Sequence, residues 1–165
     1  MLGWRSGQLA RWPRVIVESM EAVQQLAKFL TTLSCGLFAG AAIYISLVEH
    51  PARLECGAEL AVTEFGPSYR RAAVMQASLA AVGLVCAIGA WFAGAGLWWL
   101  IGGILLGSVI PFTLVVIMPT NKQLLAPTLE KRSAQASELL SRWGKLHAVR
   151  SVLSGLALVI FLLNA

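Results

Sequence analysis

The chain has 165 residues, of which 58% are apolar and only 13% are charged, and its mean hydropathy is +0.73. Soluble domains carry charge on about a quarter of their residues, so this composition excludes an ordinary soluble protein and predicts an integral membrane protein. The net charge of +5 suits the anionic headgroups of a lipid bilayer. No aromatic and basic pattern typical of a nucleic-acid-binding protein is present.

The first segment of the chain is basic and lacks a continuous apolar core. Its cationic side chains before the first acid are Arg5, Arg11 and Arg14. Organelle transit peptides and polybasic flanks of membrane helices share this bias, and Met20 offers an alternative start. We expect residues 1–21 to form a disordered or surface-lying extension, and residues 22–165 to form a single membrane domain.

Long uncharged runs predict the membrane spans. Residues 72–121 contain no Lys, Arg, Asp, Glu or His, and at 1.5 Å per residue this run is far too long for one crossing of a hydrocarbon layer of about 30 Å. Small residues at 94–96 divide it into a tight hairpin, with interfacial anchors expected at Trp91, Trp98 and Trp99. The expected architecture is all-α, a four-helix bundle with spans at about 26–48, 72–93, 97–118 and 145–164.

Two prolines and one amphipathic segment set the expected helix boundaries. Pro51 and Pro119 are each expected to end a span, because proline cannot donate a backbone hydrogen bond. Within residues 128–146, apolar side chains recur at helical spacing with charges opposite. This pattern predicts a short interfacial helix before the last span.

Small residues suggest how the spans pack. Gly36 and Gly40 in the first span, and Gly103 and Gly107 in the third, have the four-residue spacing that permits close approach of helices. The three cysteines are dispersed and lack the spacing of a metal finger, so we expect no disulfide framework. They are Cys35, Cys56 and Cys86.

Alternating crossings bring the polar residues of the chain together. The connections 49–71 and 119–146 must lie at one face of the membrane, and they carry nine of the 13 Lys and Arg when the start of the last span is included. The positive-inside tendency places this face in the cytoplasm. The only two histidines, His50 and His147, are therefore expected at the same end of the bundle.

The start of the last span contains the main candidate site. Trp143, His147, Arg150 and Ser151 follow helical spacing and share one stripe, and ionisable residues within a span usually face the bundle interior. Alternatively, Arg150 extends to the headgroups and Trp143 anchors the interface. Tyr69, before the second span, could line a substrate pocket beside Trp143 or serve as another interfacial anchor.

These residues fit several kinds of chemistry. A neutral histidine can remove a weakly acidic proton, while Arg150 and the amide of Asn121 could hold the resulting oxyanion in a dry site. A metal bound by His50 and His147, with Glu49, is a second interpretation. Haem, quinone or lipid binding is a third. Metal and haem are less favoured because the spacing typical of their ligands is absent.

The chain resembles the anthrone-oxygenase-like family of small four-span membrane proteins, most of which have no assigned function. The resemblance lies in "LFAGAAIYISLVEHPAR", "YRRAAVMQASLA", "MPTNKQL" and "RWGKLHAVRSVL", which occur in this order over most of residues 30–160. Fungal members are associated with oxidation of polyketide anthrones to anthraquinones, with no established organic cofactor. The resemblance implies that His50 or His147 is the base, that Arg150 and Asn121 stabilise an enolate, and that dioxygen is the co-substrate.

Two classes of function follow. The preferred hypothesis is a membrane-embedded oxygenase-like enzyme acting on a hydrophobic small molecule. The alternative is a noncatalytic membrane component, either a partner subunit or a lipid-, quinone- or haem-binding module, whose polar residues only seat it in the headgroups. A transporter fits less well because no charged residue or broken helix is expected near the midplane.

Overall fold

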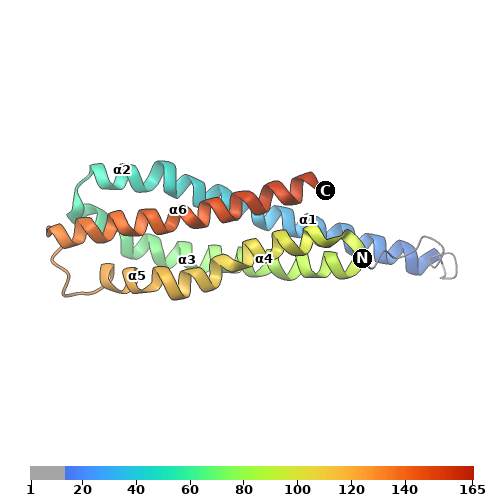
Figure 1. Cartoon of the computed structure of the whole chain (residues 1–165). Coiled ribbons are helices and arrows are strands. Elements are labelled where there is room, and N and C mark those ends of the chain that lie inside the picture. Colours follow the sequence, from blue (N-terminus) through green and yellow to red (C-terminus); the bar gives the residue numbers. More distant parts are fainter. Residues whose placement is uncertain (1–13) are drawn as a thin grey trace.

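The computed structural model describes residues 14–165, and this part of the chain is helical with no strand. The elements are α1 (Arg14–Tyr44), η2 (Ile45–Glu49), α2 (His50–Glu55), α3 (Ala58–Ala90), η3 (Trp91–Ala95), α4 (Leu97–Phe112), η4 (Thr113–Ile117), α5 (Met118–Leu124) and α6 (Ala134–Leu163). They form four long rods side by side (Figure 1). Each rod is long and apolar enough to cross a bilayer. The predicted four-span membrane bundle is confirmed.

The rods are longer than expected because prolines do not end them. The first rod continues from α1 through η2 into α2, although Pro51 lies within it. Pro51 has no N–H, and the preceding turn relaxes to π-helical geometry, in which the N–H of His50 donates to the carbonyl of Ile45. The prediction that Pro51 ends the first helix is therefore wrong.

The third rod accommodates its Pro119 in the same way, with a π-helical turn before the proline. The π-helical turn η4 lies just before Pro119, and the N–H of Met118 donates to the carbonyl of Thr113. The helix then continues to Leu124, so Pro119 does not end it either. The two connections at that end are therefore shorter than predicted. Because α2 ends at Glu55, α3 begins at Ala58 and α5 ends at Leu124, only residues 56–57 and 125–133 lie outside helices there.

The segment expected to lie on the membrane surface is part of the last rod. Ser133 caps α6 by accepting a hydrogen bond from the N–H of Ala136 at 3.1 Å. From there the helix runs to Leu163 without a break. The predicted amphipathic helix is present, but its apolar face packs in the bundle core, against Phe65 and Leu124 among others, rather than on lipid.

Glycines make the hairpin at the other end. Gly94 and Gly96 have φ values of 93° and 95°, a conformation that other residues rarely adopt. The expected break at 94–96 is confirmed. Trp99 is not an interfacial anchor, however: it is 1% exposed, stacks on Phe161, and donates its indole N–H to the carbonyl of Asn164.

Only one of the two glycine pairs brings helices together. A Cβ on Gly103 would lie 2.6 Å from the Cβ of Ala87, and one on Gly107 would lie 2.7 Å from Leu84. The third rod therefore approaches α3 closely through this pair, as predicted. Gly40 has no such neighbour within 4 Å among the described residues, so close packing at the first pair was wrongly predicted.

Both connections at the polar end lie together, as the alternating crossings require. Figure 1 shows the α2–α3 and α5–α6 connections at one end of the rods, with the α3–α4 hairpin and the C-terminus toward the other. Of the predicted extension 1–21, residues 14–21 form the first turns of α1, and residues 1–13 lie outside the described part. Which side of the membrane each end faces stays a prediction.

Candidate functional site

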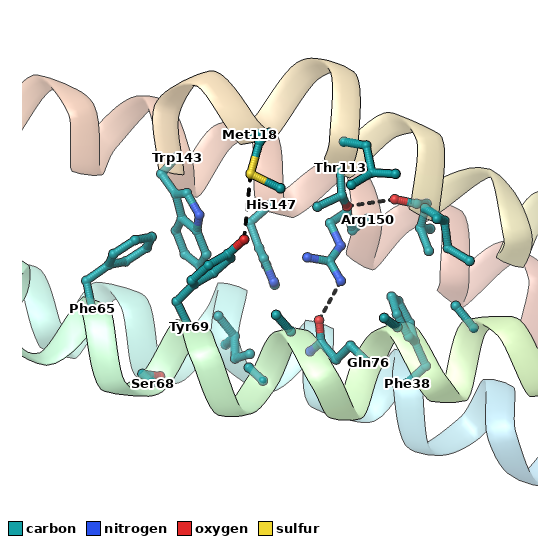
Figure 2. Close-up of a pocket in the computed structure, with 18 of the residues that line it drawn as sticks. Phe38, Phe65, Ser68, Tyr69, Gln76, Thr113, Met118, Trp143, His147 and Arg150 are labelled. Carbon is teal, nitrogen blue, oxygen red and sulfur yellow. Dashed lines mark hydrogen bonds between the residues drawn. The ribbon is translucent and has the colours of Figure 1, made fainter. Parts of the chain in front are cut away.

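A cavity of about 180 Å³ lies inside the bundle near its polar end. Apolar and aromatic side chains form most of its wall, and its polar lining residues are Glu49, Arg53, Ser68, Tyr69, Gln76, Thr113, Trp143, His147 and Arg150. Figure 2 shows the rings of Phe65, Tyr69 and Trp143 at one end of this space, His147 beside them, and the Arg150 guanidinium farther along, toward Phe38. Four of the six residues singled out in the sequence line it: Tyr69, Trp143, His147 and Arg150.

His147 is fixed by a chain of hydrogen bonds. Its Nδ1 lies 3.0 Å from the Ser46 hydroxyl, which lies 2.8 Å from the Ser151 hydroxyl. Ser151 in turn donates to the carbonyl of Ala42 at 2.8 Å. Each hydroxyl has one proton, so Ser151 is committed to Ala42, Ser46 donates to Ser151, and Ser46 accepts from Nδ1–H of His147.

This proton count determines the histidine tautomer. With the proton of a neutral imidazole held on Nδ1, the lone pair is on Nε2. No hydrogen bond from a described residue engages Nε2, and His147 lines the cavity. The π-helical turn η2 has a direct part in this arrangement, because it carries Ser46. The structure therefore places a lone pair suited to accepting a proton beside the cavity.

Arg150 lies within the bundle rather than extending to the headgroups. Its guanidinium donates to Oε1 of Gln76 at 2.5 Å and lies 5.3 Å above the Phe38 ring. Gln76 is 2% exposed. Gln76 carries no charge and so gives little signal in the sequence, although it is the only amide between residues 72 and 118.

Two donors of this pair are unused. Nε of Arg150 and Nε2 of Gln76 are buried and have no hydrogen-bond partner among residues 14–165. A buried donor without an acceptor costs about 1–3 kcal/mol. A ligand oxygen in the cavity that accepted from either group would recover this cost.

Trp143 is held from four sides. Its ring stacks on His147 with a centroid separation of 4.7 Å, and it contacts His50 at 5.1 Å and the edge of Phe65 at 5.3 Å. Its indole N–H donates to Oδ1 of Asn121 at 2.9 Å. Asn121 and His50 are buried but do not line the cavity, so their contacts place them behind Trp143.

The two histidines therefore lie at the same end of the bundle, as expected, and both contact the Trp143 ring, but only His147 lines the cavity. His50 packs against Gly144, where a Cβ would come within 2.5 Å of the His50 ring. Neither ring nitrogen of His50 has a hydrogen-bond partner in the described part of the chain. The contact of His50 with the cavity wall is its contact with the Trp143 ring.

We expect Gly144→Ala to displace His50 and to lower the free energy of unfolding by about 1–3 kcal/mol, the usual cost of overpacking. This exceeds the gain of up to about 1 kcal/mol that alanine brings to a helix interior. Thermal unfolding of the purified protein in detergent measures the effect. Gly155→Ala on the same helix is the matched control, because a Cβ there meets no described atom within 4 Å. Equal unfolding midpoints for the two variants would contradict the proposed packing.

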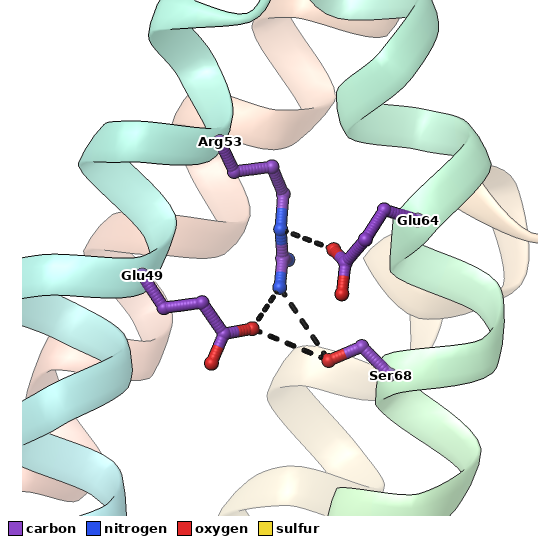
Figure 3. Close-up of polar contacts among 4 residues, drawn as sticks. All are labelled: Glu49, Arg53, Glu64 and Ser68. Atoms are coloured by element: carbon purple, nitrogen blue, oxygen red, sulfur yellow. Dashed lines mark hydrogen bonds and ion pairs between the residues drawn. The ribbon is translucent and has the colours of Figure 1, made fainter.

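A second polar cluster forms the wall toward α2 and the α2–α3 connection. Arg53 is 8% exposed and makes ion pairs with Glu49 and with Glu64, the latter at 2.5 Å. Ser68 donates to Glu49 at 3.3 Å (Figure 3). Glu49 and Arg53 are four residues apart, the spacing of a helical ion pair. This spacing predicts no pair when Pro51 is expected to end the helix between the two residues.

Tyr69 closes the cavity on the α5 side. Its ring stacks on Phe65 at 5.7 Å, and its hydroxyl lies 3.9 Å from the sulfur of Met118.

As for metals, residues 14–165 contain no group of three or more His, Cys, Asp or Glu side chains that could hold an ion. His50, His147 and Glu49, weighed above as metal ligands, therefore do not form such a group in the described part of the chain.

Comparison with known proteins places the chain. The family model described as anthrone oxygenase matches residues 65–160, more than half of the sequence. The chain belongs to the anthrone oxygenase family. The matched region contains Tyr69, Gln76, Trp143, His147 and Arg150, and so covers the α3 and α6 walls of the cavity. The predicted resemblance is confirmed.

A curated relative supports the same assignment. Anthrone oxygenase tpcL of Aspergillus fumigatus is 40% identical over 62 residues, which are 36% of this chain and 38% of the relative. The match thus spans well under half of that protein. No solved structure matches the chain. Membership of the anthrone oxygenase family supports an oxygenase-like function.

Proposed function

We propose that this protein is a membrane-embedded oxygenase that oxidises a planar, hydrophobic, anthrone-type carbonyl compound with dioxygen. One observation carries the proposal: the Nε2 lone pair of His147 and the guanidinium of Arg150 adjoin the same largely apolar cavity. A base and an oxyanion site in a dry space are what enolate formation from such a substrate requires.

The first step is removal of a proton from carbon. Nε2 of His147 takes a proton from the ring methylene opposite the substrate carbonyl, and the electron pair of the broken C–H bond moves onto the carbonyl oxygen. Arg150, oriented by Gln76, donates hydrogen bonds to this oxyanion. The amide N–H of Gln76 supplies a further donor. Such donors have their greatest effect away from water.

Dioxygen then completes the reaction. The enolate transfers one electron to dioxygen, and the two radicals combine to form a carbon–oxygen bond. The resulting peroxide anion takes the proton held by His147 and becomes a hydroperoxide. Loss of the second methylene proton and cleavage of the O–O bond give a new carbonyl and one water molecule. The sum is one anthrone and one dioxygen converted to one anthraquinone and one water, so no external reductant is needed.

The aromatic end of the cavity suits a planar substrate. Phe65, Tyr69 and Trp143 present ring faces and edges at that end, and aromatic pairs gain about 0.5–1.5 kcal/mol beyond burial of their area. Asn121 is assigned a positioning role, because it holds the Trp143 indole and does not line the cavity. His50 is also assigned a positioning role, because it contacts the Trp143 ring and does not line the cavity.

The proposal is tested with purified protein in liposomes supplied with anthrone and air. Dioxygen consumption and anthraquinone formation are followed together, because anthrone also oxidises slowly by itself. We expect protein-dependent formation of one anthraquinone per dioxygen consumed. A rate equal to that of empty liposomes would contradict the proposed function.

A further inference from the structure

The cavity also reaches the outer surface of the bundle between α3 and the third rod. Ala73 and Ala77 line it from α3, and Ile110 and Leu114 line it from α4 and η4. Ala77 is exposed at the bundle surface, and Leu114 is 59% exposed. Residues that line a cavity and are also exposed mark the place where that cavity opens.

Two contacts limit this opening along α3. Toward the hairpin, Leu84 packs against Gly107, where a Cβ would lie 2.7 Å away. Toward the polar end, the hydroxyl of Tyr69 lies 3.9 Å from the sulfur of Met118. Between these contacts the α3 residues that line the cavity are alanines, apart from Gln76, which bonds Arg150. We call this gap, bordered by Ala73, Ala77, Ile110 and Leu114, the side opening.

We expect the side opening to lie at the depth of the acyl chains. At 1.5 Å per residue, Ala77 is roughly 20–25 Å along α3 from the α3–α4 hairpin, within a hydrocarbon layer of about 30 Å that begins at this hairpin. The residues on its border are apolar, and the Thr113 hydroxyl beside it is already engaged, since it donates to the carbonyl of Val109 at 2.6 Å. Such a surface favours contact with a lipid-soluble molecule over contact with water.

The polar wall is a poor route for an apolar molecule. Glu49, Arg53, Glu64 and Ser68 form a connected set of ion pairs and hydrogen bonds there, and passage of an aromatic ring would separate the buried Arg53 from its two partly exposed carboxylates. The two walls of the cavity thus differ in chemistry, with charge toward the α2–α3 connection and small apolar side chains toward lipid.

The size of the cavity agrees with this route. Pockets that bury most of a drug-sized ligand are about 300–1,000 Å³, whereas this cavity has about 180 Å³. A three-ring substrate is therefore expected to fill the cavity and to reach the side opening, which is its apolar one.

We infer that the substrate is a membrane-dissolved, planar polycyclic compound that enters through the side opening with its oxygen-bearing edge first. The oxygen reaches Arg150 and Gln76, while the trailing ring stays between the alanines of α3 and Leu114, in contact with lipid. Because the trailing ring of the substrate stays in contact with lipid, that edge of the substrate must be uncharged. This inference depends on the proposed function only for the identity of the ligand.

Filling the side opening tests the route. Ala77→Trp is expected to lower kcat/KM for anthrone in liposomes at least tenfold, mostly through KM. Val74→Trp is the matched control, because Val74 lies on the same helix, is 70% exposed and does not line the cavity; its kcat/KM should stay within about twofold of the parent value. Equal kinetics for Ala77→Trp and the parent protein would overturn the inference.

A second experiment does not need turnover. Ala77→Cys and Val74→Cys are made in a background with Cys56→Ser and Cys86→Ser, and the proteins in liposomes are labelled with a lipid-soluble pyrene maleimide. Anthraquinone, an unreactive three-ring probe, is expected to slow labelling of the Ala77→Cys thiol at least threefold and to leave the Val74→Cys thiol unaffected. Equal slowing at both positions, or at neither, would contradict the side opening. Protection without anthrone oxidation by the parent protein would retain the route and reject the proposed function.

Discussion

Replacing His147 with glutamine should lower the rate of anthrone oxidation by about 10²–10⁴-fold, the usual contribution of a positioned general base. Glutamine keeps a similar shape and can still donate to Ser46, but its amide cannot accept a proton as imidazole does. The decisive measurement is dioxygen consumption in liposomes with equal amounts of folded protein. A variant that retains more than a tenth of the parent rate would exclude His147 as the base.

A matched pair of variants separates the base from the residue that orients it. Ser46→Ala removes the acceptor for Nδ1–H and leaves the imidazole in place, so we expect a smaller loss, on the order of tenfold, because the required tautomer becomes less populated. His50→Gln acts only through the contact with Trp143 and should retain most of the activity. Equal losses for His147→Gln and His50→Gln would indicate that the histidines are needed for structure rather than for proton transfer.

Removing the guanidinium should have the second large effect. Arg150→Met is expected to lower kcat for anthrone oxidation by about 10²–10³-fold, in line with loss of an oxyanion donor. Arg150→Lys keeps the charge but loses the planar fork of donors, and should recover only part of this loss. Steady-state kinetics in liposomes measure both variants. An unchanged kcat in Arg150→Met would exclude Arg150 as the group that stabilises the substrate oxyanion.

Stability distinguishes this role from a structural one. Gln76→Leu leaves the buried cation of Arg150 without its acceptor, and should lower the free energy of unfolding by about 1.5–3 kcal/mol. In the double variant Gln76→Leu with Arg150→Met both partners are apolar, so the free energy of unfolding should return close to the parent value. The double variant should nevertheless be inactive. A double variant that is both stable and active would show that the pair serves only packing.

Much of the fold was predictable because the membrane imposes it. The spans follow from uncharged runs, and the hairpin at 94–96 follows from glycines that adopt positive φ. The lengths of the rods were not predictable from the expectation that a proline ends a helix. At Pro51 and Pro119 a π-helical turn accommodates the missing N–H, and packing against neighbouring rods stabilises the continued helix.

The candidate site was only partly predictable. Helical spacing correctly placed Trp143, His147 and Arg150 on one buried stripe of α6. Gln76 and Ser46 were missed, because an uncharged polar residue in a span carries little signal until its partner is known. Arg53 was missed because its helix was expected to end at Pro51.

The sequence by itself determined that the chain forms four membrane spans and that its histidines lie at one end of the bundle. Composition and the alternation of crossings suffice for this, because backbone N–H and C=O groups within hydrocarbon must be hydrogen-bonded inside the protein. Charged residues are tolerated only in short stretches at the ends of the spans. Only the tertiary structure decided which histidine adjoins the cavity, which side chains contact its imidazole and which lining residues are exposed at the bundle surface. Periodicity tells which residues share a face of one helix, but these three properties depend on contacts between helices, and those are set by how side chains of different rods fit together.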